Sequence, residues 1–182
     1  SSPTPGSSNI HEGFSTLSQS DSVKFSAEGG FFAGGFDLQL SSADPADSIF
    51  FTLDGSEPSA DDPLYSNPIH ISGNCVIRAR LLNFHKIPGV VITRTYIIRD
   101  HTLPVVCLST DPYNLWDYNY GIYVMGPGAS ATYPYFGANF WQDWERKAHM
   151  EFYDENGVKQ IDQDIGIKIF GNYSRANDQR SL

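Results

Sequence analysis

The sequence predicts a mainly β protein, in which an antiparallel β-sandwich is followed by a truncated α+β segment. Three observations predict this class. Apolar and polar residues alternate in short runs between residues 22 and 98, with Pro and Gly breakers between the runs. The same stretch has no apolar period of 3.6 residues, which a helix would require. Beyond residue 100, signals for a helix start and for a hairpin both appear.

The predicted sandwich spans residues 22–99 and contains four clear runs. They are Phe36–Leu40, Ile49–Leu53, Cys75–Leu82 and Val90–Ile98. In the third run the residues of one face are small or apolar, namely Cys75, Ile77, Ala79 and Leu81. We expect this face in a core, and Arg78 and Arg80 of the opposite face in water. Residues 1–21 are rich in Ser, Thr, Pro and Gly, a composition typical of a linker, and the start of the chain is expected to be a cut rather than a natural terminus.

Residues 100–182 have a mixed pattern. Strands are predicted at Leu103–Ser109 and Gly121–Met125. Between them, Asp111-Pro112 predicts a helical turn over residues 112–117, because Asp is a good N-cap and Pro suits the first helical position. A second short helix is expected over Asn139–Lys147.

A hairpin is the strongest signal in this half. Ala148–Tyr153 and Ile161–Phe170 flank Asn156-Gly157, and both turn residues tolerate a positive φ. Isoleucines line one face of the second strand and need a partner layer: Ile161, Ile165, Ile167 and Ile169. Residues 100–182 are therefore expected to open a larger α+β domain whose remainder lies beyond Leu182.

Charge excludes two classes of partner. The 182 residues include 12 Lys and Arg against 21 Asp and Glu, a formal net charge of −9, and the basic residues are split evenly between the halves. This excludes nucleic-acid binding by phosphate neutralisation and a polybasic membrane patch. The apolar runs are far shorter than the ~20 residues of a membrane span, so none is predicted.

The sequence contains no clear set of metal ligands and no clear reactive thiol. Cys75 and Cys107 lie in apolar runs without a Cys-x-x-Cys spacing, so we expect small core residues. The five histidines lack the spacing that places two rings on one metal, and no metal site is predicted from them. Four acidic residues share one turn-rich segment: Asp54, Glu57, Asp61 and Asp62. They could bind calcium, or they could make the local hydrogen bonds that are usual for acidic residues in turns.

Two further sets of residues are candidate ligand sites. Eleven aromatic residues lie within residues 113–144, and Trp116, Trp141 and Trp144 are candidates for stacking on sugars. Packing is the alternative, because aromatics bury large areas wherever irregular segments meet. Near the end of the sequence, Gly171, Arg175 and Arg180 combine close backbone approach with fixed cations, which can bind phosphates; ordinary turn glycines and solvated arginines are the alternative.

The run FFTLDGSEPS at residues 50–59 is the most specific motif of the first half. It continues in Pro63–Tyr65, Pro68–Ile71, Val76–Arg80 and Thr95–Ile98. Together these segments closely resemble the chitobiase/β-hexosaminidase C-terminal-type module. The resemblance implies an Ig-like or fibronectin-III-like sandwich that is accessory to other domains, is not catalytic, and is often assigned a sugar-binding role.

The second half resembles another family. The matching segments are Leu103–Val106, Asp111–Trp116, Gly121–Val124, Trp144–Ala148, Glu151–Gly157, Gly166–Arg175 and Gln179–Leu182. They resemble the N-terminal part of the CotH family, the spore-coat-type atypical protein kinases. The family implies phosphorylation of protein Ser or Thr with ATP and a divalent metal in the complete domain. Its catalytic acidic residues are expected downstream of Leu182, so this segment alone is expected to hold no cofactor and not to be catalytic.

The CotH resemblance also bears on the candidate phosphate site. Arg180 stands where relatives often have a basic residue, frequently Lys, which is expected to face nucleotide phosphates. Arg keeps the charge but not the compact ammonium group of Lys.

The resemblances together predict the setting of the chain. Pro3–Ser7 is similar to the tail of a lamin-tail-like sandwich, which often precedes this pair of domains. We therefore expect a piece of a bacterial surface or secreted multidomain protein, located outside the cell, whose partners are the rest of its own chain and glycans or surface and coat proteins. The alternative is a carbohydrate-binding module that uses the sandwich or the loop 113–144.

Overall fold

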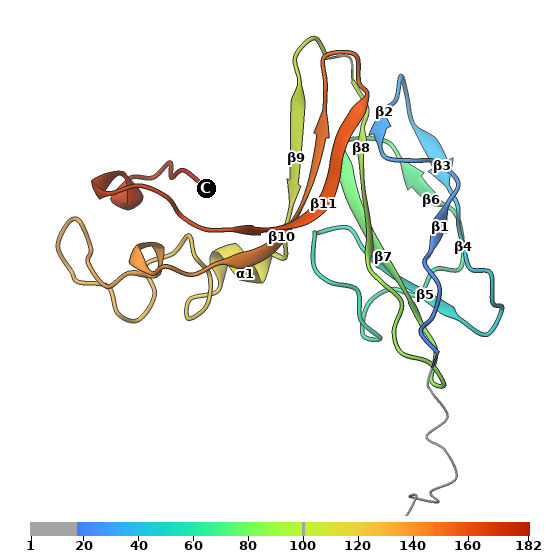
Figure 1. The fold of residues 1–182 in the computed structure, drawn as a ribbon, viewed down its shortest axis with the longest axis horizontal. Helices are drawn as coiled ribbons and strands as arrows, with labels where there is room; N and C mark the ends of the chain where they lie inside the picture. Colours follow the sequence, from blue (N-terminus) through green and yellow to red (C-terminus); the bar gives the residue numbers. More distant parts are fainter. Residues whose placement is uncertain (1–17, 100) are drawn as a thin grey trace, which may run out of the picture.

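Strands dominate the structure, a computed structural model that describes residues 18–99 and 101–182 (Figure 1). The strands are β1 Lys24–Phe25, β2 Gly30–Phe31, β3 Phe36–Leu38, β4 Leu40–Ser41, β5 Ser48–Thr52, β6 Ile69–Ile71, β7 Cys75–Leu82, β8 Ile92–Ile97, β9 Val105–Ser109, β10 Arg146–Tyr153 and β11 Lys159–Ile167. The helices are α1 Pro112–Trp116 and two single 3₁₀ turns, η1 Asn139–Trp141 and η2 Tyr173–Ala176. The predicted mainly β class is confirmed.

The first module consists of two facing β-layers. One layer is a four-stranded sheet in the order β2-β8-β7-β5, antiparallel except for the parallel pair β2–β8. The other layer contains the antiparallel pairs β1–β4 and β3–β6. The core between them is built from Val23, Leu38, Leu40, Ile49, Ile71, Ile77, Ala79, Leu81 and Tyr96. The inward face predicted for β7 is confirmed, because Ile77, Ala79 and Leu81 are all fully buried.

The predicted linker is only partly within the described residues. Residues 1–17 lie outside them. Just before the first strand, Gln19 forms a parallel bridge with Ile87, and Ser20 is buried beside it. The N–H of Ser20 donates to Ile87 O at 2.9 Å, which holds this segment against the sandwich.

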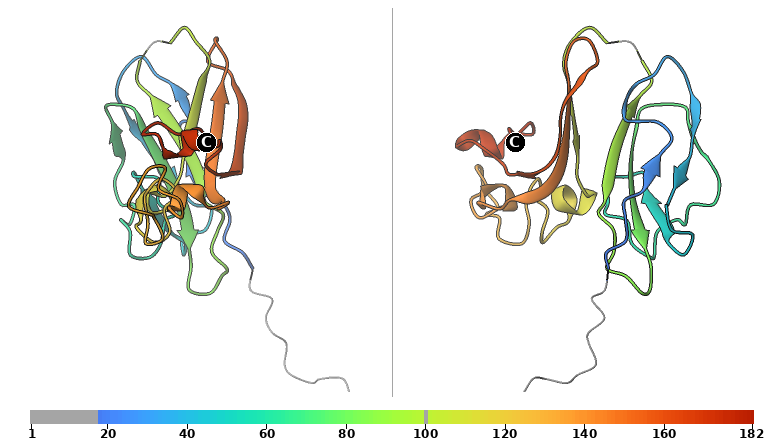
Figure 2. Two further views of the ribbon diagram at one scale, coloured as in Figure 1. Left: turned by 90° about the vertical axis from the view of Figure 1, so that its left-hand side faces the viewer. Right: turned by 45° about the vertical axis from the view of Figure 1, so that its right-hand side comes forward.

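A third layer covers the outer face of the sandwich. It is an antiparallel sheet in the order β11-β10-β9, and Figure 2 shows it stacked against the four-stranded sheet. The expectation that Arg78 and Arg80 lie in water is therefore wrong. Both are half-buried, because the face of β7 that carries them is turned toward this third layer.

The β10–β11 hairpin confirms the prediction from Asn156-Gly157, although the turn differs in detail. Gly157 has a φ of 76°, whereas Asn156 is not among the described residues with positive φ. The turn is closed by Asp154, whose carboxylate accepts the N–H groups of Asn156 and Val158 at 2.9 Å each. One glycine with positive φ is thus enough for this longer turn.

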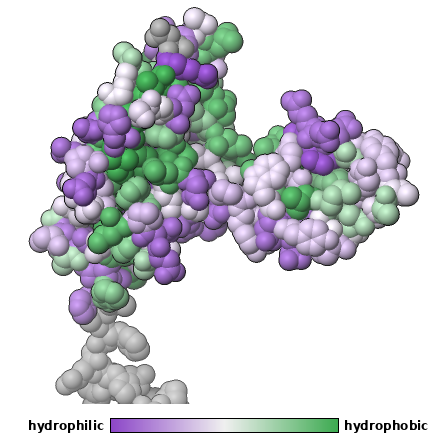
Figure 3. All heavy atoms as spheres, turned by 180° about the vertical axis from the view of Figure 1, so that it is seen from behind, coloured by the Kyte–Doolittle hydropathy of each residue, from purple (hydrophilic) through white to green (hydrophobic). Residues whose placement is uncertain are grey.

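An irregular lobe lies on the side of β10 and β11 that faces away from the sandwich (Figures 1 and 2). Its core consists of Ile122, Ala138, Phe140, Ala148, Ile167, Ile169 and Ala176. Two of the predicted face isoleucines, Ile167 and Ile169, are therefore buried, while Ile161 and Ile165 are half-buried. Figure 3 shows the lobe from behind, projecting from the layered part.

Local predictions in the lobe have mixed outcomes. The turn at α1 is confirmed, and the carboxylate of Asp111 accepts the N–H of Tyr113 at 2.8 Å. Gly121–Met125 is not a strand, because Ile122 and Tyr123 donate their N–H groups back to carbonyls of α1.

The helix predicted over Asn139–Lys147 is wrong beyond its first turn. Only η1 is helical, no side chain caps its N-terminus, and Arg146 already belongs to β10. Without a cap, a short helix has little to offset the cost of nucleation. None of the helices among the described residues is long and apolar enough to cross a membrane.

Candidate functional site

The centre of the contact between the sandwich and the third layer is the side chain of Glu151. We call this contact the junction. Glu151 is fully buried; its Oε2 accepts the backbone N–H of Thr95 at 2.9 Å, and its Oε1 accepts the hydroxyl of Tyr153 at 3.0 Å. Burial, together with the charge of Glu151, raises the pKa of Tyr153, so this hydroxyl remains a donor.

Strand lengths explain why Thr95 is available to Glu151. Strand β2 runs parallel to β8 and pairs with it only at Tyr96 and Ile97, so it begins one residue past Thr95 and leaves the Thr95 backbone unpaired on that side. Gly29 precedes β2, and a Cβ there would lie 2.9 Å from Thr95 O and 3.0 Å from Glu151 Oε1. The carboxylate therefore occupies a place that the edge of a longer strand would fill.

Ion pairs surround Glu151 and also cross the junction. Arg94 of β8 lies 2.8 Å from Glu28 and 3.3 Å from Asp162 of β11, and Lys159 lies 2.5 Å from Asp162. The buried ring of His149 lies within 3.2 Å of Asp162. Burial raises the pKa of Asp162, but the hydrogen bond and charge of Lys159 and the charge of Arg94 outweigh it, so the net pKa is lowered.

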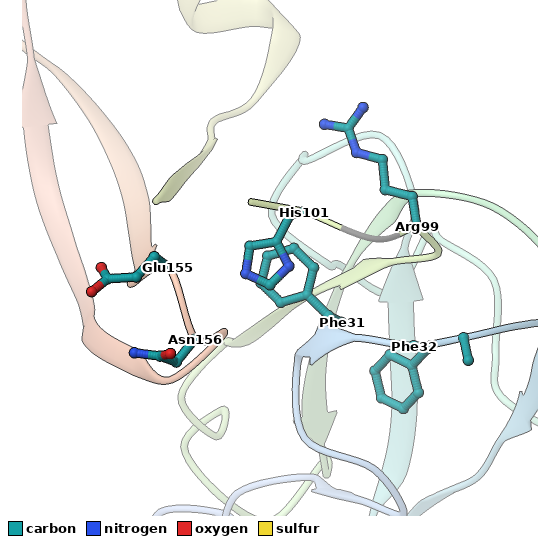
Figure 4. Close-up of a pocket in the computed structure, with 7 residues that line it drawn as sticks. Phe31, Phe32, Arg99, His101, Glu155 and Asn156 are labelled. Carbon is teal, nitrogen blue, oxygen red and sulfur yellow. The ribbon is translucent and has the colours of Figure 1, made fainter. Parts of the chain in front are cut away.

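Contacts also occur at the two ends of the junction. At one end the Phe31 ring stacks on His101 with centroids 3.5 Å apart, beside a shallow pocket of about 440 Å³ (Figure 4). Arg99 and the hairpin turn at Glu155 line the same pocket. At the other end the turn at Gly55, whose φ is 89°, approaches the backbone of Thr110.

A cleft of about 850 Å³ lies between the modules near the Gly55 end. It is lined by Glu57, Arg78, Arg80, Val90, Val91, Asp111, Asn114, Tyr120, Glu145, Lys147, Ala148, Asp164, Ile165 and Gly166. Arg80 pairs with Glu57 at 3.1 Å and donates to Gly89 O. Size and position are those of small-molecule sites, which occupy roughly 300–1,000 Å³ and often lie between domains.

The structure brings together the three residues predicted to bind phosphate. Arg175 donates to Gly171 O at 2.7 Å, and Arg180 donates to Arg175 O at 2.6 Å. The Arg180 guanidinium also lies over the rings of Phe140 and Tyr123, at 4.3 and 5.0 Å. Burial lowers the pKa of Arg180. Several donors of both arginines therefore hold the lobe together, and phosphate binding there stays a prediction.

The three candidate tryptophans have different surroundings. Trp116 is 58% exposed and meets Tyr123 edge-on. Trp141 is half-buried, and its indole N–H donates to Pro134 O at 2.8 Å. Trp144 is half-buried with the Arg146 guanidinium 4.9 Å from its ring. Of the three, Trp116 offers the most open ring.

Acidic residues of the turn at residues 54–62 make local hydrogen bonds, and the two cysteines are unpaired. Asp54 accepts the side chain and N–H of Ser56, and both bonds lower its pKa; Asp62 accepts the same two groups of Ser59. No group of three or more metal-ligating side chains occurs among residues 18–99 and 101–182. Cys75 and Cys107 are free and half-buried, and burial raises the pKa of both thiols.

Glu151, Arg94 and Asp162 are the junction residues that the sequence analysis missed. The alternation of β10 places Glu151 on the same face as His149 and Tyr153, and a polar face of this kind is typical of a solvated strand side. The aromatic Tyr153 on that face is the one signal that could have indicated a covered surface.

Comparison with known proteins finds one similarity, which lies in the sandwich. Residues 27–93 match the family model of the chitobiase/beta-hexosaminidase C-terminal domain, a carbohydrate-associated β-sandwich module. This supports the first predicted resemblance over most of the sandwich. No curated protein and no solved structure matches the chain. The match ends before residue 103, so the CotH resemblance stays a prediction.

Proposed function

We propose that the sandwich is an accessory module that positions the segment after it, within a bacterial surface or secreted protein carrying a CotH-like domain. The observation that carries the positioning role is Glu151, a fully buried carboxylate of the third layer bonded to the backbone of Thr95 in the sandwich. A flexible tether between modules needs no such contact. A fixed orientation does, because separating the modules would expose the acceptor and leave its donors without their partner.

Three contacts along the junction support a fixed orientation. Phe31–His101 lies at one end, Glu151–Thr95 in the middle and Gly55–Thr110 at the other end. Contacts at a single point would permit a hinge, whereas contacts spread along two sheets oppose both bending and twisting. The match to a carbohydrate-associated module of accessory type agrees with this role.

The CotH-like part of the proposal is supported by the motifs of residues 103–182. In it, ATP and a divalent metal belong to the complete CotH-like domain, and the sandwich contributes orientation rather than chemistry.

NMR relaxation of backbone amides tests the positioning role. We expect one rotational correlation time for the amides of β5, β7 and β8 and those of β9, β10 and β11. In Glu151→Ala we expect the two sets to separate. Asp143→Asn is the matched control, because it breaks an exposed ion pair with Lys168 outside the junction. Separate correlation times in the unmodified chain would overturn the proposal.

A second candidate function is glycan binding by the aromatic lobe, favoured by the exposed ring of Trp116. Screening the chain on a glycan array tests it, and Trp116→Ala should abolish binding without changing the Tm. Phe84→Ala is a suitable control, since Phe84 is a fully exposed aromatic of the sandwich. An array without any hit would reject this function.

A further inference from the structure

Both walls of the junction cleft carry charged groups. On the sandwich wall Arg80 is paired with Glu57, which leaves the guanidinium group of Arg78 without an ion-pair partner among the described residues. The facing wall provides the carboxylates of Asp111, Glu145 and Asp164 together with the ammonium group of Lys147. A ligand between the walls therefore meets the donors of Arg78 on one side and a majority of acceptors on the other.

Arg78 lines the cleft and keeps unused hydrogen-bonding capacity. Its Nη1 donates to Gly55 O at 2.8 Å, and its Nε donates to Thr93 Oγ1 at 3.3 Å. It forms no ion pair within the described residues, although the charges of Glu57 on its own wall and of Asp164 and Asp111 on the facing wall act on it. A gap thus separates a guanidinium from two carboxylates.

The carboxylates across the gap also have acceptors to spare. Asp111 uses Oδ1 for the N–H of Tyr113, and Asp164 uses Oδ1 for His149. The side chain of Asp164 is 89% exposed, so its other oxygen faces solvent. Each carboxylate has further lone pairs that a ligand donor can reach.

The balance of charge selects the chemistry of the ligand. Three cations and four carboxylates line the cleft, so a strongly anionic or cationic ligand would meet repulsion from one of the two sets. A hydroxyl group both donates and accepts, so it can bridge a guanidinium and a carboxylate that are too far apart to pair directly. Val90, Val91 and Ile165 add apolar surface for the C–H faces of a sugar ring.

We propose that the junction cleft binds a neutral oligosaccharide, with its hydroxyl groups bridging Arg78 on one wall and Asp111 and Asp164 on the other. This goes beyond positioning, because the site is formed only where the two modules meet. The site also differs from the Trp116 surface. The ring of Tyr120, the aromatic residue of the cleft, stacks on Tyr113 and lies under Arg146, so polar groups dominate recognition here.

The experiment begins with the full chain on an array of neutral oligosaccharides, printed beside sulfated and phosphorylated oligosaccharides. The strongest neutral hit is then titrated by calorimetry against Asp111→Asn and Asp164→Asn. Asn is as good an N-cap as Asp, so Asp111→Asn should leave α1 and the Tm unchanged. Asp143→Asn is the control for loss of one carboxylate outside the cleft.

We expect a neutral hit whose Kd rises about tenfold in each cleft variant, because a charged acceptor is replaced by a weaker neutral one. Asp143→Asn and Trp116→Ala should leave this Kd unchanged. Binding restricted to sulfated or phosphorylated glycans, or no binding, would overturn the proposal. Binding abolished by Trp116→Ala but unaffected by the cleft variants would overturn it too, while leaving glycan binding by the lobe intact. The NMR test of positioning needs no glycan, so a failure of positioning and a failure of glycan binding give different results.

Discussion

Glu151 lies fully buried between two sheets, yet both of its oxygens accept a hydrogen bond. Removing a carboxylate from water is costly unless other groups replace the lost hydration. Here the replacements are the Thr95 N–H, the Tyr153 hydroxyl and the charge of Lys159 at 3.6 Å. Two of these come from its own sheet, so the Thr95 bond is what makes the residue a contact between modules.

Glu151→Ala should lower the free energy of unfolding by about 3 kcal/mol, because buried donors on both modules lose their acceptor. For a chain of this length that corresponds to a fall in Tm of roughly 6–12 °C. Glu151→Gln should lose less, since its amide oxygen can still accept the Thr95 N–H. Thermal unfolding followed by circular dichroism measures both variants. Equal losses for Ala and Gln would contradict this account of the hydrogen bonds.

At the scale of elements, short strands and turns set the distance between the layers. Strand β2 begins past Thr95, which leaves the Thr95 N–H free to bond Glu151, and the carbonyl of Gly55 accepts a hydrogen bond from Arg78. The φ of 89° at Gly55 is strained for any residue with a Cβ. A Cβ would also lie 2.6 Å from Thr110 O across the junction.

Gly55→Ala should therefore destabilise the protein by about 2 kcal/mol or more, through backbone strain and a clash with Thr110. Gly73→Ala is the matched control, because a Cβ there meets nothing within 4 Å and its φ is not in the strained region. Chemical denaturation measures both changes. A Gly55→Ala variant as stable as Gly73→Ala would show that the turn does not press on the third layer.

Elements with a self-contained signal could be predicted from the sequence. Strand β7 has strict alternation, α1 has a cap with a proline, and the β10–β11 hairpin has a turn pair, so each depends on neighbours in sequence. Gly121–Met125 has the composition of a strand but bonds back to α1. The structure of this segment depends on which backbone acceptors lie nearby in space, and the alternation of apolar and polar residues does not encode that.

At the scale of the whole molecule, the junction could not be predicted from the sequence. The alternation of side chains along a strand shows which residues share a face of a sheet, but not what covers that face. Arg78 on β7 and Glu151 on β10 both belong to polar faces that look solvated in sequence. Stacked against each other, the two faces become an interface with ion pairs and a cleft. Candidate residues chosen for their type alone, such as Arg180 and Trp141, instead lie in the lobe.

Contact between the two modules should depend on pH, and the pKa of Asp162 determines the pH range in which it weakens. Its pKa lies below the ordinary 3.8, so its ionised form is stabilised in the folded state. That contribution is fully present above about pH 4 and is lost as the pH falls through the lowered folded value. Asp162→Asn lacks the contribution at every pH.

The Tm of Asp162→Asn should consequently lie below that of the unmodified chain at neutral pH, with the difference constant down to about pH 4 and closing below it. Asp143→Asn should change the Tm little at any pH, because its partner Lys168 and its own carboxylate are largely exposed. Since Arg94 joins Asp162 to the sandwich, the same acid range should also begin to separate the two correlation times measured by NMR. A Tm difference that persists unchanged well below pH 4 would mean that Asp162 acts by packing and not through its charge.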